Sequence, residues 1–485
     1  MKEFAERISV IGGISLISLV LCVGLLFTIK SGFFQFRFLG HIMKKTFGSM
    51  LGSENVSGKG TLNPLQAVSA AVGGTVGVGS IGGVATAIAA GGPGAVFWLW
   101  VCALIGMMTK MAEVSLAVYY RSADEDGNIY GGPTHYMEKG LGTEKGFKVW
   151  VIPAVIFGGG IFATFFFSVQ NYTVSEAVAS TFGIDMIVVS AVFCLLVMAV
   201  ALGGIPRLGK AAGRLVPFMC FFYITGGLIV ILIDAGNLPA TFRLIFKSAF
   251  TGTAAVGGFT GAAFAQVIQV GVARSVYCNE AGWGTSPMIH STARVAHPVA
   301  QGLWGGFEVF LDTVIICTIT AVAIINTGAW QLTDAEGVRL TGAPLALMAF
   351  ELKLGVIGRY IVTISAFLFG VTTEIGWYAY YEILLRHMLR DNRKLKKKIL
   401  KIFRIISPLP SMVVTILAVL YGLPSGIVWL IADVVTGIPT FVNLIVILLL
   451  SKTFFMLLRD YKARYLGINR VDPDVRLFYE DKKIS

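Results

Sequence analysis

The sequence predicts an all-α membrane protein that crosses a bilayer many times. Hydrophobic residues make up 55% of the 485 residues, and charged residues only 14%. Uncharged apolar runs of about 20 residues, the length that spans a bilayer as a helix, recur along the whole chain. One run, from Pro64 to Gly94, is interrupted in its middle by glycines, which weaken a helix interior.

Eleven apolar stretches are separated by short polar loops, and they indicate a single transmembrane domain without a soluble domain. The first stretch continues without a small-residue cleavage site, so we expect it to be a span and not a removable signal. The expected spans lie near residues 8–29, 64–90, 94–120, 149–170, 182–204, 215–234, 244–272, 299–327, 357–385, 402–421 and 425–457.

The distribution of Lys and Arg predicts the orientation of these spans. Basic residues collect in alternate loops, namely Lys30, Arg37, Lys44, Lys45, Lys59, Arg121, Lys139, Lys145, Lys148, Arg207, Lys210, Arg214, Arg274, Arg294, the run 386–404 and the tail 459–483. The positive-inside rule places these loops in the cytoplasm, the N-terminus outside and the C-terminus inside. Topology thus accounts for the formal net charge of +12, and we expect no nucleic-acid partner.

A second apolar stretch, 249–272, is also interrupted by glycines, at Gly257, Gly258 and Gly261. The predicted topology makes the two interrupted stretches antiparallel. Each opens a group of five spans, 64–234 and 244–457, with one extra span at 8–29 in front and a cytoplasmic tail at 458–485. Two inverted five-span units that each begin with a broken helix are typical of the leucine-transporter-type fold.

Long motifs in a fixed order resemble a known family. They are GVATAIAAGGPGAVFWLWVCALIGMMTKMAEV at 83–114, GGPTHYMEKGLG at 131–142, GVARSVYCNEAGWGTSPMIHSTARVAHPVAQGLWG at 271–305, FLDTVIICTITAVAII at 310–325 and TTEIGW at 372–377. The chain is thereby similar to the alanine or glycine:cation symporters of the amino acid–polyamine–cation superfamily. The resemblance implies import of a small neutral amino acid, coupled to sodium or proton entry, with no other cofactor. It also implies a prokaryotic-type plasma membrane, and we expect a monomer.

The resemblance places the substrate at the first interruption. Gly77, Val78, Gly79 and Ser80 occupy the position of the family's Gly-x-Gly-Asn break. Half-helix N-termini favour a carboxylate there, and free carbonyls suit an ammonium or a sodium ion. The alternative is that these glycines serve close helix packing.

Further substrate contacts are implied in the fourth, seventh and ninth predicted spans. Gln170 matches a family Val-Gln pair, and its amide can both donate to and accept from a zwitterion; it could instead end a helix at the interface. Gly257 and Gly258 would form the opposite wall, with Phe259 as an apolar lid. Trp377 would complete the cavity four residues after Thr373.

Three consecutive residues are candidate ligands for the coupling cation. Thr372 and Thr373 match a family Ser-Thr pair and offer hydroxyl oxygens, although both could bond back to a carbonyl one turn earlier. Glu374 replaces an apolar family residue, and a mid-span carboxylate is a functional hypothesis by default. It could ligate the cation, carry a proton or neutralise a substrate amine, or it could stay protonated.

Departures from the family pattern make the substrate an open question. Ser80 replaces the usual Asn, and Val78 replaces a frequent Thr, so alternative substrates are other small zwitterions or an amine, with Glu374 as the coupling group. Lys110, Glu113, Asp312 and Asp433 are interpreted as packing and gating groups, although Asp312 or Asp433 could instead contact an ion, and Asn279 and Glu280 are interpreted as gate residues of a cytoplasmic loop. A membrane-embedded enzyme or a channel is the rival class, but the five histidines are scattered and no charged rings are evident.

Overall fold

The computed structural model describes residues 2–50, 60–251, 261–334 and 337–480, which are mostly helical. The elements before residue 252 are α1 (Lys2–Lys30), α2 (Phe34–Arg37), α3 (Leu39–Lys45), α4 (Phe47–Met50), α5 (Pro64–Thr75), η1 (Val78–Ser80), α6 (Gly82–Gly91), α7 (Gly94–Tyr119), β1 (Ser122–Ala123), β2 (Ile129–Tyr130), α8 (Pro133–Tyr136), η2 (Met137–Glu144), α9 (Val151–Phe166), α10 (Gln170–Phe182), α11 (Met186–Ala201), α12 (Gly204–Ile233), η3 (Ala235–Asn237) and α13 (Leu238–Thr251). The elements from residue 261 onward are α14 (Gly261–Asn279), α15 (Ser286–His290), α16 (Pro298–Val309), η4 (Phe310–Cys317), α17 (Thr318–Asn326), η5 (Ala329–Gln331), α18 (Gly342–Leu354), α19 (Val356–Met388), α20 (Arg393–Ile406), α21 (Leu409–Leu420), α22 (Ser425–Leu449) and α23 (Ser451–Leu466).

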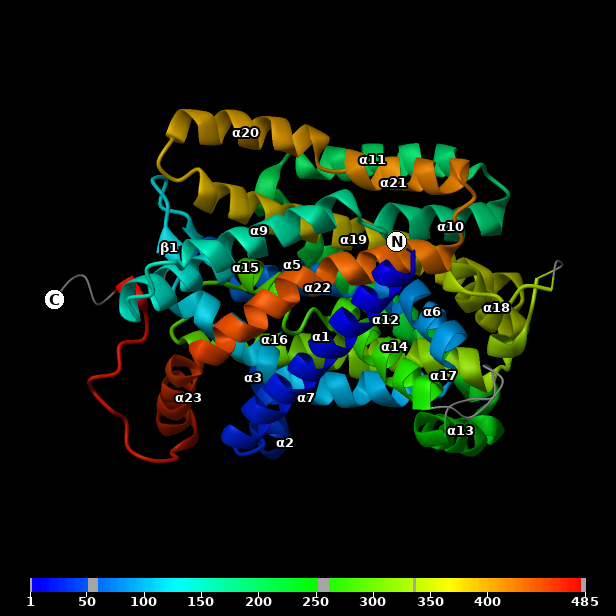
Figure 1. The fold of residues 1–485 in the computed structure, drawn as a ribbon, viewed down its shortest axis with the longest axis horizontal. Coiled ribbons are helices and arrows are strands. Elements are labelled where there is room, and N and C mark those ends of the chain that lie inside the picture. The colour runs from blue at the N-terminus through cyan, green and yellow to red at the C-terminus, as the bar shows by residue number, and fades with distance from the viewer. Residues whose placement is uncertain (1, 51–59, 252–260, 335–336, 481–485) are drawn as a thin grey trace.

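The long helices run mainly along the long axis of the molecule (Figure 1). Helices α13 and α18 lie at one end of this axis, and the hairpin β1–β2 lies at the other end with α23 and the C-terminus. The hairpin is antiparallel, with Ser122 opposite Tyr130. The basic tail and the hairpin therefore share one end, as the charge-derived topology predicts for cytoplasmic segments.

Eight helices among the described residues are long and apolar enough to cross a membrane, and each falls in one of the eleven predicted spans. Two further predicted spans contain shorter apolar helices, Gly82–Gly91 and Met186–Ala201. The remaining one, 244–272, includes residues 252–260, which lie outside the described part. The outer surface fits a lipid environment, because large apolar side chains are exposed on many of these helices, for example Val155, Leu195, Phe221, Leu232 and Ile357.

The first predicted interruption is a real break in the helix. Helix α5 begins with a capping box, in which Asn63 Oδ1 accepts a hydrogen bond of 2.7 Å from the Gln66 N–H. It ends at Thr75, a short 3-10 turn η1 follows, and α6 resumes at Gly82. Each half therefore exposes helix-end N–H or C=O groups within the membrane domain.

A second break in the described residues follows α14. Helix α14 is continuous from Gly261 to Asn279, and the chain leaves the helix at Glu280 before α15 begins at Ser286. Gly282 and Gly284 adopt φ of 94° and 86° in this loop, a conformation that glycine adopts without strain. Of the predicted interruption, Gly257 and Gly258 fall outside the described residues and Gly261 is the first residue of α14, so that interruption stays a prediction.

Helices α5 and α19 approach each other at backbone distance. A Cβ on Gly376 would lie 2.6 Å from the Gly74 Cα, so no larger residue fits at Gly376 without separating the two helices. This contact places the end of α5 against the middle of α19. The broken helix and the helix that carries Thr373 and Trp377 thereby form one wall of the site described next.

Candidate functional site

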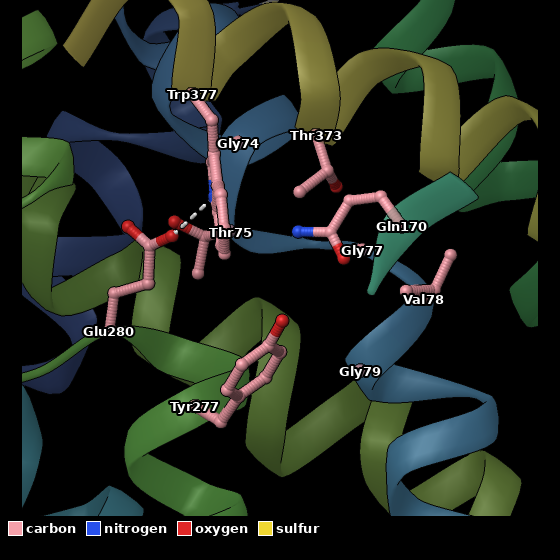
Figure 2. Close-up of a pocket in the computed structure, with 10 residues that line it drawn as sticks. All are labelled: Gly74, Thr75, Gly77, Val78, Gly79, Gln170, Tyr277, Glu280, Thr373 and Trp377. Carbon is pink, nitrogen blue, oxygen red and sulfur yellow. Dashed lines mark hydrogen bonds between the residues drawn. The ribbon is translucent and has the colours of Figure 1, made fainter. Parts of the chain in front are cut away.

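A small cavity lies where the two breaks meet, enclosed by the ends of α5 and α14, the start of α10 and the middle of α19 (Figure 2). It contains about 200 Å³ of space between atoms, part of which is open to solvent, so the enclosed space is small. Its lining residues are Gly74, Thr75, Gly77, Val78, Gly79, Gln170, Tyr277, Glu280, Thr373 and Trp377.

Six predicted substrate contacts are brought together in this lining: Gly77, Val78, Gly79, Gln170, Thr373 and Trp377. Ser80 is not among them, because its hydroxyl turns away and donates to Asp312 Oδ1 at 2.5 Å. Gly257, Gly258 and Phe259 lie outside the described residues. Whether the six residues contact a substrate stays a prediction.

The break brings Gly77 against α19 with no room for a side chain. A Cβ on Gly77 would overlap Thr373 Oγ1. The same hydroxyl donates to the Gly73 carbonyl at 3.2 Å, so it caps the end of α5. Thr373 therefore ties the unwound segment to α19 and presents an oxygen at the edge of the cavity.

Two polar groups in the lining make no hydrogen bond of standard geometry within the described residues, although their side chains lie close enough to each other to interact. They are the side-chain oxygen of Gln170 and the hydroxyl of Tyr277, both buried. Figure 2 shows the Gln170 amide extending from α10 toward Gly77 and Thr373. An unsatisfied buried polar group lowers the stability of the fold by roughly 1–3 kcal/mol. These two groups therefore indicate that a polar ligand binds in the cavity.

Glu280 forms the end wall and corrects our sequence interpretation, which placed it in a cytoplasmic loop. Its carboxylate accepts from Trp377 Nε1 at 3.0 Å, from Thr285 Oγ1 at 2.6 Å and from the Tyr380 hydroxyl at 3.2 Å. Its φ of 55° lies in the left-handed region, which a non-glycine residue rarely adopts and which often marks functional sites. Glu280 holds the indole of Trp377 in place against the cavity.

A buried network continues from the cavity along one side. Lys110 Nζ donates to the Glu280 carbonyl at 3.0 Å and lies 3.7 Å from Glu308 Oε1. Thr75 donates to the same Glu308 oxygen, and His290 Nε2 contacts the other at 2.6 Å. Gln301 donates its amide N–H to His290 Nδ1 at 2.8 Å, which makes Nε2 the protonated nitrogen of His290. The cavity is therefore joined to α7, α15 and α16 by paired charges.

Arg274 is a second correction, because the sequence interpretation counted it among loop residues. It lies within α14, is 3% exposed, and pairs with Asp433 Oδ2 of α22 at 3.0 Å. Its guanidinium lies over the Trp429 ring at 4.5 Å and near the Tyr277 ring at 5.5 Å. This ion pair lies next to Tyr277, which lines the cavity.

The three candidate cation ligands face three different neighbours. Thr372 Oγ1 donates back to the carbonyls of Leu368 and Phe369, both at 3.0 Å, as the alternative interpretation expects. Thr373 faces α5, and Glu374 accepts from Ser168 at 3.1 Å at the junction of α9 and α10. The structure therefore does not gather Thr372, Thr373 and Glu374 into one coordination shell.

Sequence reasoning missed four lining residues: Gly74, Thr75, Tyr277 and Glu280. For Tyr277 and Glu280 a signal was available in the motif NEAGWG, where two glycines follow a helix-length run that ends at Asn279. This signal was overlooked because the basic residue Arg274 suggested that the segment had already left the membrane.

A cavity enclosed by two broken helices within a bundle of membrane helices defines a secondary transporter. The fold is shared with a solved structure: a sodium-coupled sialic acid symporter superposes with a TM-score of 0.53 at 12% identity, covering 94% of this chain and 92% of that one. At this identity the likeness concerns the fold alone.

The chain belongs to the sodium:alanine symporter family, whose pattern matches residues 2–471. It is 37% identical to an uncharacterized transporter of Haemophilus influenzae over 96% of this chain and 97% of that protein. It is also 37% identical to the sodium/alanine symporter AgcS of Methanococcus maripaludis, over 91% and 93%. The protein is therefore a multi-pass membrane transporter that moves an amino acid together with a cation, and it is not an enzyme.

Proposed function

We propose that the protein imports a small neutral amino acid, alanine or glycine, together with sodium, and that the substrate binds in the cavity between the two breaks. The observation that carries this proposal is the cavity itself. It is small, it lies at helix ends, and it holds two polar groups that make no hydrogen bond of standard geometry within the described residues, Gln170 Oε1 and the Tyr277 hydroxyl.

The proposed pose follows from the chemistry of the walls. N–H groups at the starts of η1 and α6 suit the substrate carboxylate, since helix N-termini attract anions. Gln170 Oε1 and the carbonyls at the end of α5 suit the ammonium group. Val78 and Trp377 leave an apolar space for a hydrogen or a methyl side chain, which would favour the smallest amino acids.

Sodium is the proposed coupling ion, because the relative from Methanococcus maripaludis is named a sodium/alanine symporter. The hydroxyl of Thr373 and the carbonyl of Gly73 supply neutral oxygens at the end of α5, the ligand type that a hard cation accepts. Thr372 and Glu374 remain candidate ligands. Following the positive-inside rule, we place the hairpin β1–β2 and the C-terminus in the cytoplasm and the N-terminus outside.

Uptake by the purified protein in liposomes tests this function. We expect saturable accumulation of labelled alanine or glycine when sodium is high outside, and little accumulation when potassium replaces it. Uncoupled, unsaturable flux would contradict symport. A screen of thermal stabilisation by small amino acids, other zwitterions and amines then identifies the substrate, because a ligand stabilises the folded state that binds it.

A second candidate substrate, an amine or another zwitterion with Glu374 as the coupling group, is suggested by two departures from the family pattern. Val78 and Ser80 replace hydrogen-bonding family residues in or beside the cavity. However, Glu374 faces Ser168 and is not part of the cavity lining, so it cannot contact a substrate amine in this conformation. A stronger thermal shift with an amine than with alanine would favour this candidate.

A further inference from the structure

Asp312 lies in the wide π-helical turn η4, directly behind the first break. It is fully buried, and its two oxygens are both engaged: Oδ1 accepts from Ser80 Oγ at 2.5 Å, and Oδ2 accepts from Thr313 Oγ1 at 2.8 Å and from Cys317 Sγ at 3.8 Å. Turns of this kind occur frequently at functional sites. The carboxylate thus sits among hydroxyl oxygens in the centre of the membrane domain.

No basic side chain pairs with Asp312 in the described part of the chain. The ionisable groups that face it from the neighbouring elements are Glu308, Glu280 and the thiols of Cys220, Cys278 and Cys317. Lys110 approaches Glu308 instead, at 3.7 Å. A buried carboxylate surrounded by acids and thiols requires a cation or a proton, since an isolated buried charge is very costly.

Both breaks reach this carboxylate. Ser80 belongs to η1, and its carbonyl accepts from Thr320 of α17 at 2.7 Å. Asn279, the last residue of α14, donates to Thr313 Oγ1 at 3.1 Å. A cation bound here would therefore hold η1, the end of α14 and η4 in one arrangement, on the far side of η1 from the cavity.

We propose that Asp312, with the hydroxyl oxygens of Ser80 and Thr313, binds a hard monovalent cation, sodium, at a site separate from Thr373. The inference rests on the proposed cation coupling and adds a second site to it. Each hydroxyl keeps lone pairs that can face a cation once its hydrogen turns away from Asp312. The oxygen ligands favour a hard cation over a soft metal, although Cys278 and Cys317 lie within 4.8 Å.

Sodium titration of the purified protein tests this site, with alanine binding and thermal stability as the readouts. The unsubstituted protein should respond to sodium with a Hill coefficient above one. Asp312→Asn should lower the Hill coefficient to one and raise the half-saturating sodium concentration by about tenfold or more. Asp185→Asn is the matched control, because Asp185 caps α11 at the surface and Asn caps equally well.

Two further variants keep the test decisive if Asp312→Asn folds poorly. Ser80→Ala removes one ligand oxygen without touching the charge, and should also raise the half-saturating sodium concentration. Cys317→Ala removes no oxygen but does remove the thiol that donates to Asp312 Oδ2, so it should change the titration less than Ser80→Ala does. A shift in Cys317→Ala as large as that in Asp312→Asn would overturn the oxygen site in favour of a thiol-containing metal site.

The outcomes separate this inference from the proposed function. If the unsubstituted protein binds alanine equally well without sodium, sodium coupling fails, and the Asp312 site fails with it. If the unsubstituted protein responds to sodium and Asp312→Asn responds identically, only the Asp312 site is overturned. Loss of pH dependence with an unchanged sodium titration would show that Asp312 carries a proton, which also overturns the cation site.

Discussion

At the residue scale, Gly77 is the position where the cavity is most sensitive to a single methyl group. Gly77→Ala places a Cβ on the Thr373 hydroxyl, so the break must move or Thr373 must leave the Gly73 carbonyl. We expect alanine binding to be lost and the folded state to be destabilised by roughly 1–3 kcal/mol. Isothermal titration and thermal unfolding measure both effects.

The control for this substitution is Gly159→Ala on α9, where an added Cβ would meet no atom within 4 Å. That variant should bind alanine as the unsubstituted protein does and be no less stable, because Ala suits a helix interior better than Gly. Normal binding by Gly77→Ala would show that the cavity is not the substrate site.

Glu374 offers a second test at this scale. Glu374→Gln keeps an oxygen that can accept from Ser168 but removes the charge. Because Glu374 does not line the cavity, we expect alanine affinity at saturating sodium to stay within a few-fold of the original. The sodium dependence or the pH profile of uptake should change.

Glu125→Gln in the exposed hairpin loop is the control for charge removal. A Glu374→Gln variant with unchanged uptake, sodium dependence and pH profile would remove Glu374 from the coupling mechanism. Its buried contact with Ser168 would then be purely structural.

Particular residues show what could be predicted from the sequence. The break at Gly77 was predictable, because glycines in an uncharged apolar run are a local signal. The role of Glu280 was not, since Arg274 resembles a loop residue until its partner Asp433, 159 positions away, is known. Whether Thr372 bonds to carbonyls of its own helix was not predictable either. These bonds leave its hydroxyl less free to bind a cation.

At the scale of elements, α16 begins with a pH-sensitive cap. His297 Nδ1 accepts from the Val299 N–H at 3.0 Å, and Nε2 lies 3.1 Å from Asp460 Oδ2 of α23. Burial lowers the pKa of His297 to about 4, outweighing the hydrogen bond that Nε2 donates to Asp460, which raises the pKa. Neutral His297 therefore fits the fold, and protonation at Nδ1 abolishes the cap.

The sign of the pH dependence follows from this lowered pKa. Between pH 6.5 and about 4 the unfolded chain binds a proton that the folded chain excludes, so stability falls as the pH falls through this window. The full effect is on the order of 3 kcal/mol. Thermal unfolding between pH 7.5 and 4.5 should show it, and His297→Asn, which can still cap a helix, should flatten the slope. Equal slopes in both proteins would contradict this role.

Helix positions were easier to predict than helix junctions. Eight predicted spans coincide with apolar helices, because a bilayer-length apolar run depends only on local composition. The junction at Asn279 depends on packing: Asn279 and Glu280 are buried only because α7, α16 and α19 surround them. A local pattern carries no information about such neighbours.

At the scale of the whole molecule, the predicted orientation can be tested by labelling. Asp126→Cys in the hairpin loop and Gly236→Cys in η3 lie at opposite ends of the bundle by our topology. An impermeant maleimide added to intact cells should label Gly236→Cys and reach Asp126→Cys only after permeabilisation. The unsubstituted protein, with its six native cysteines, gives the background; the reverse pattern would invert the topology.

The glycine contact between α5 and α19 has a mechanical consequence. Gly74 and Gly376 meet without side chains between them, so the backbones of α5 and α19 approach closely at this position. Beside it, a side chain joins the two helices, since the Thr373 hydroxyl donates to the Gly73 carbonyl. Because Gly74 also lines the cavity, a change in the angle between α5 and α19 would change the width of the cavity.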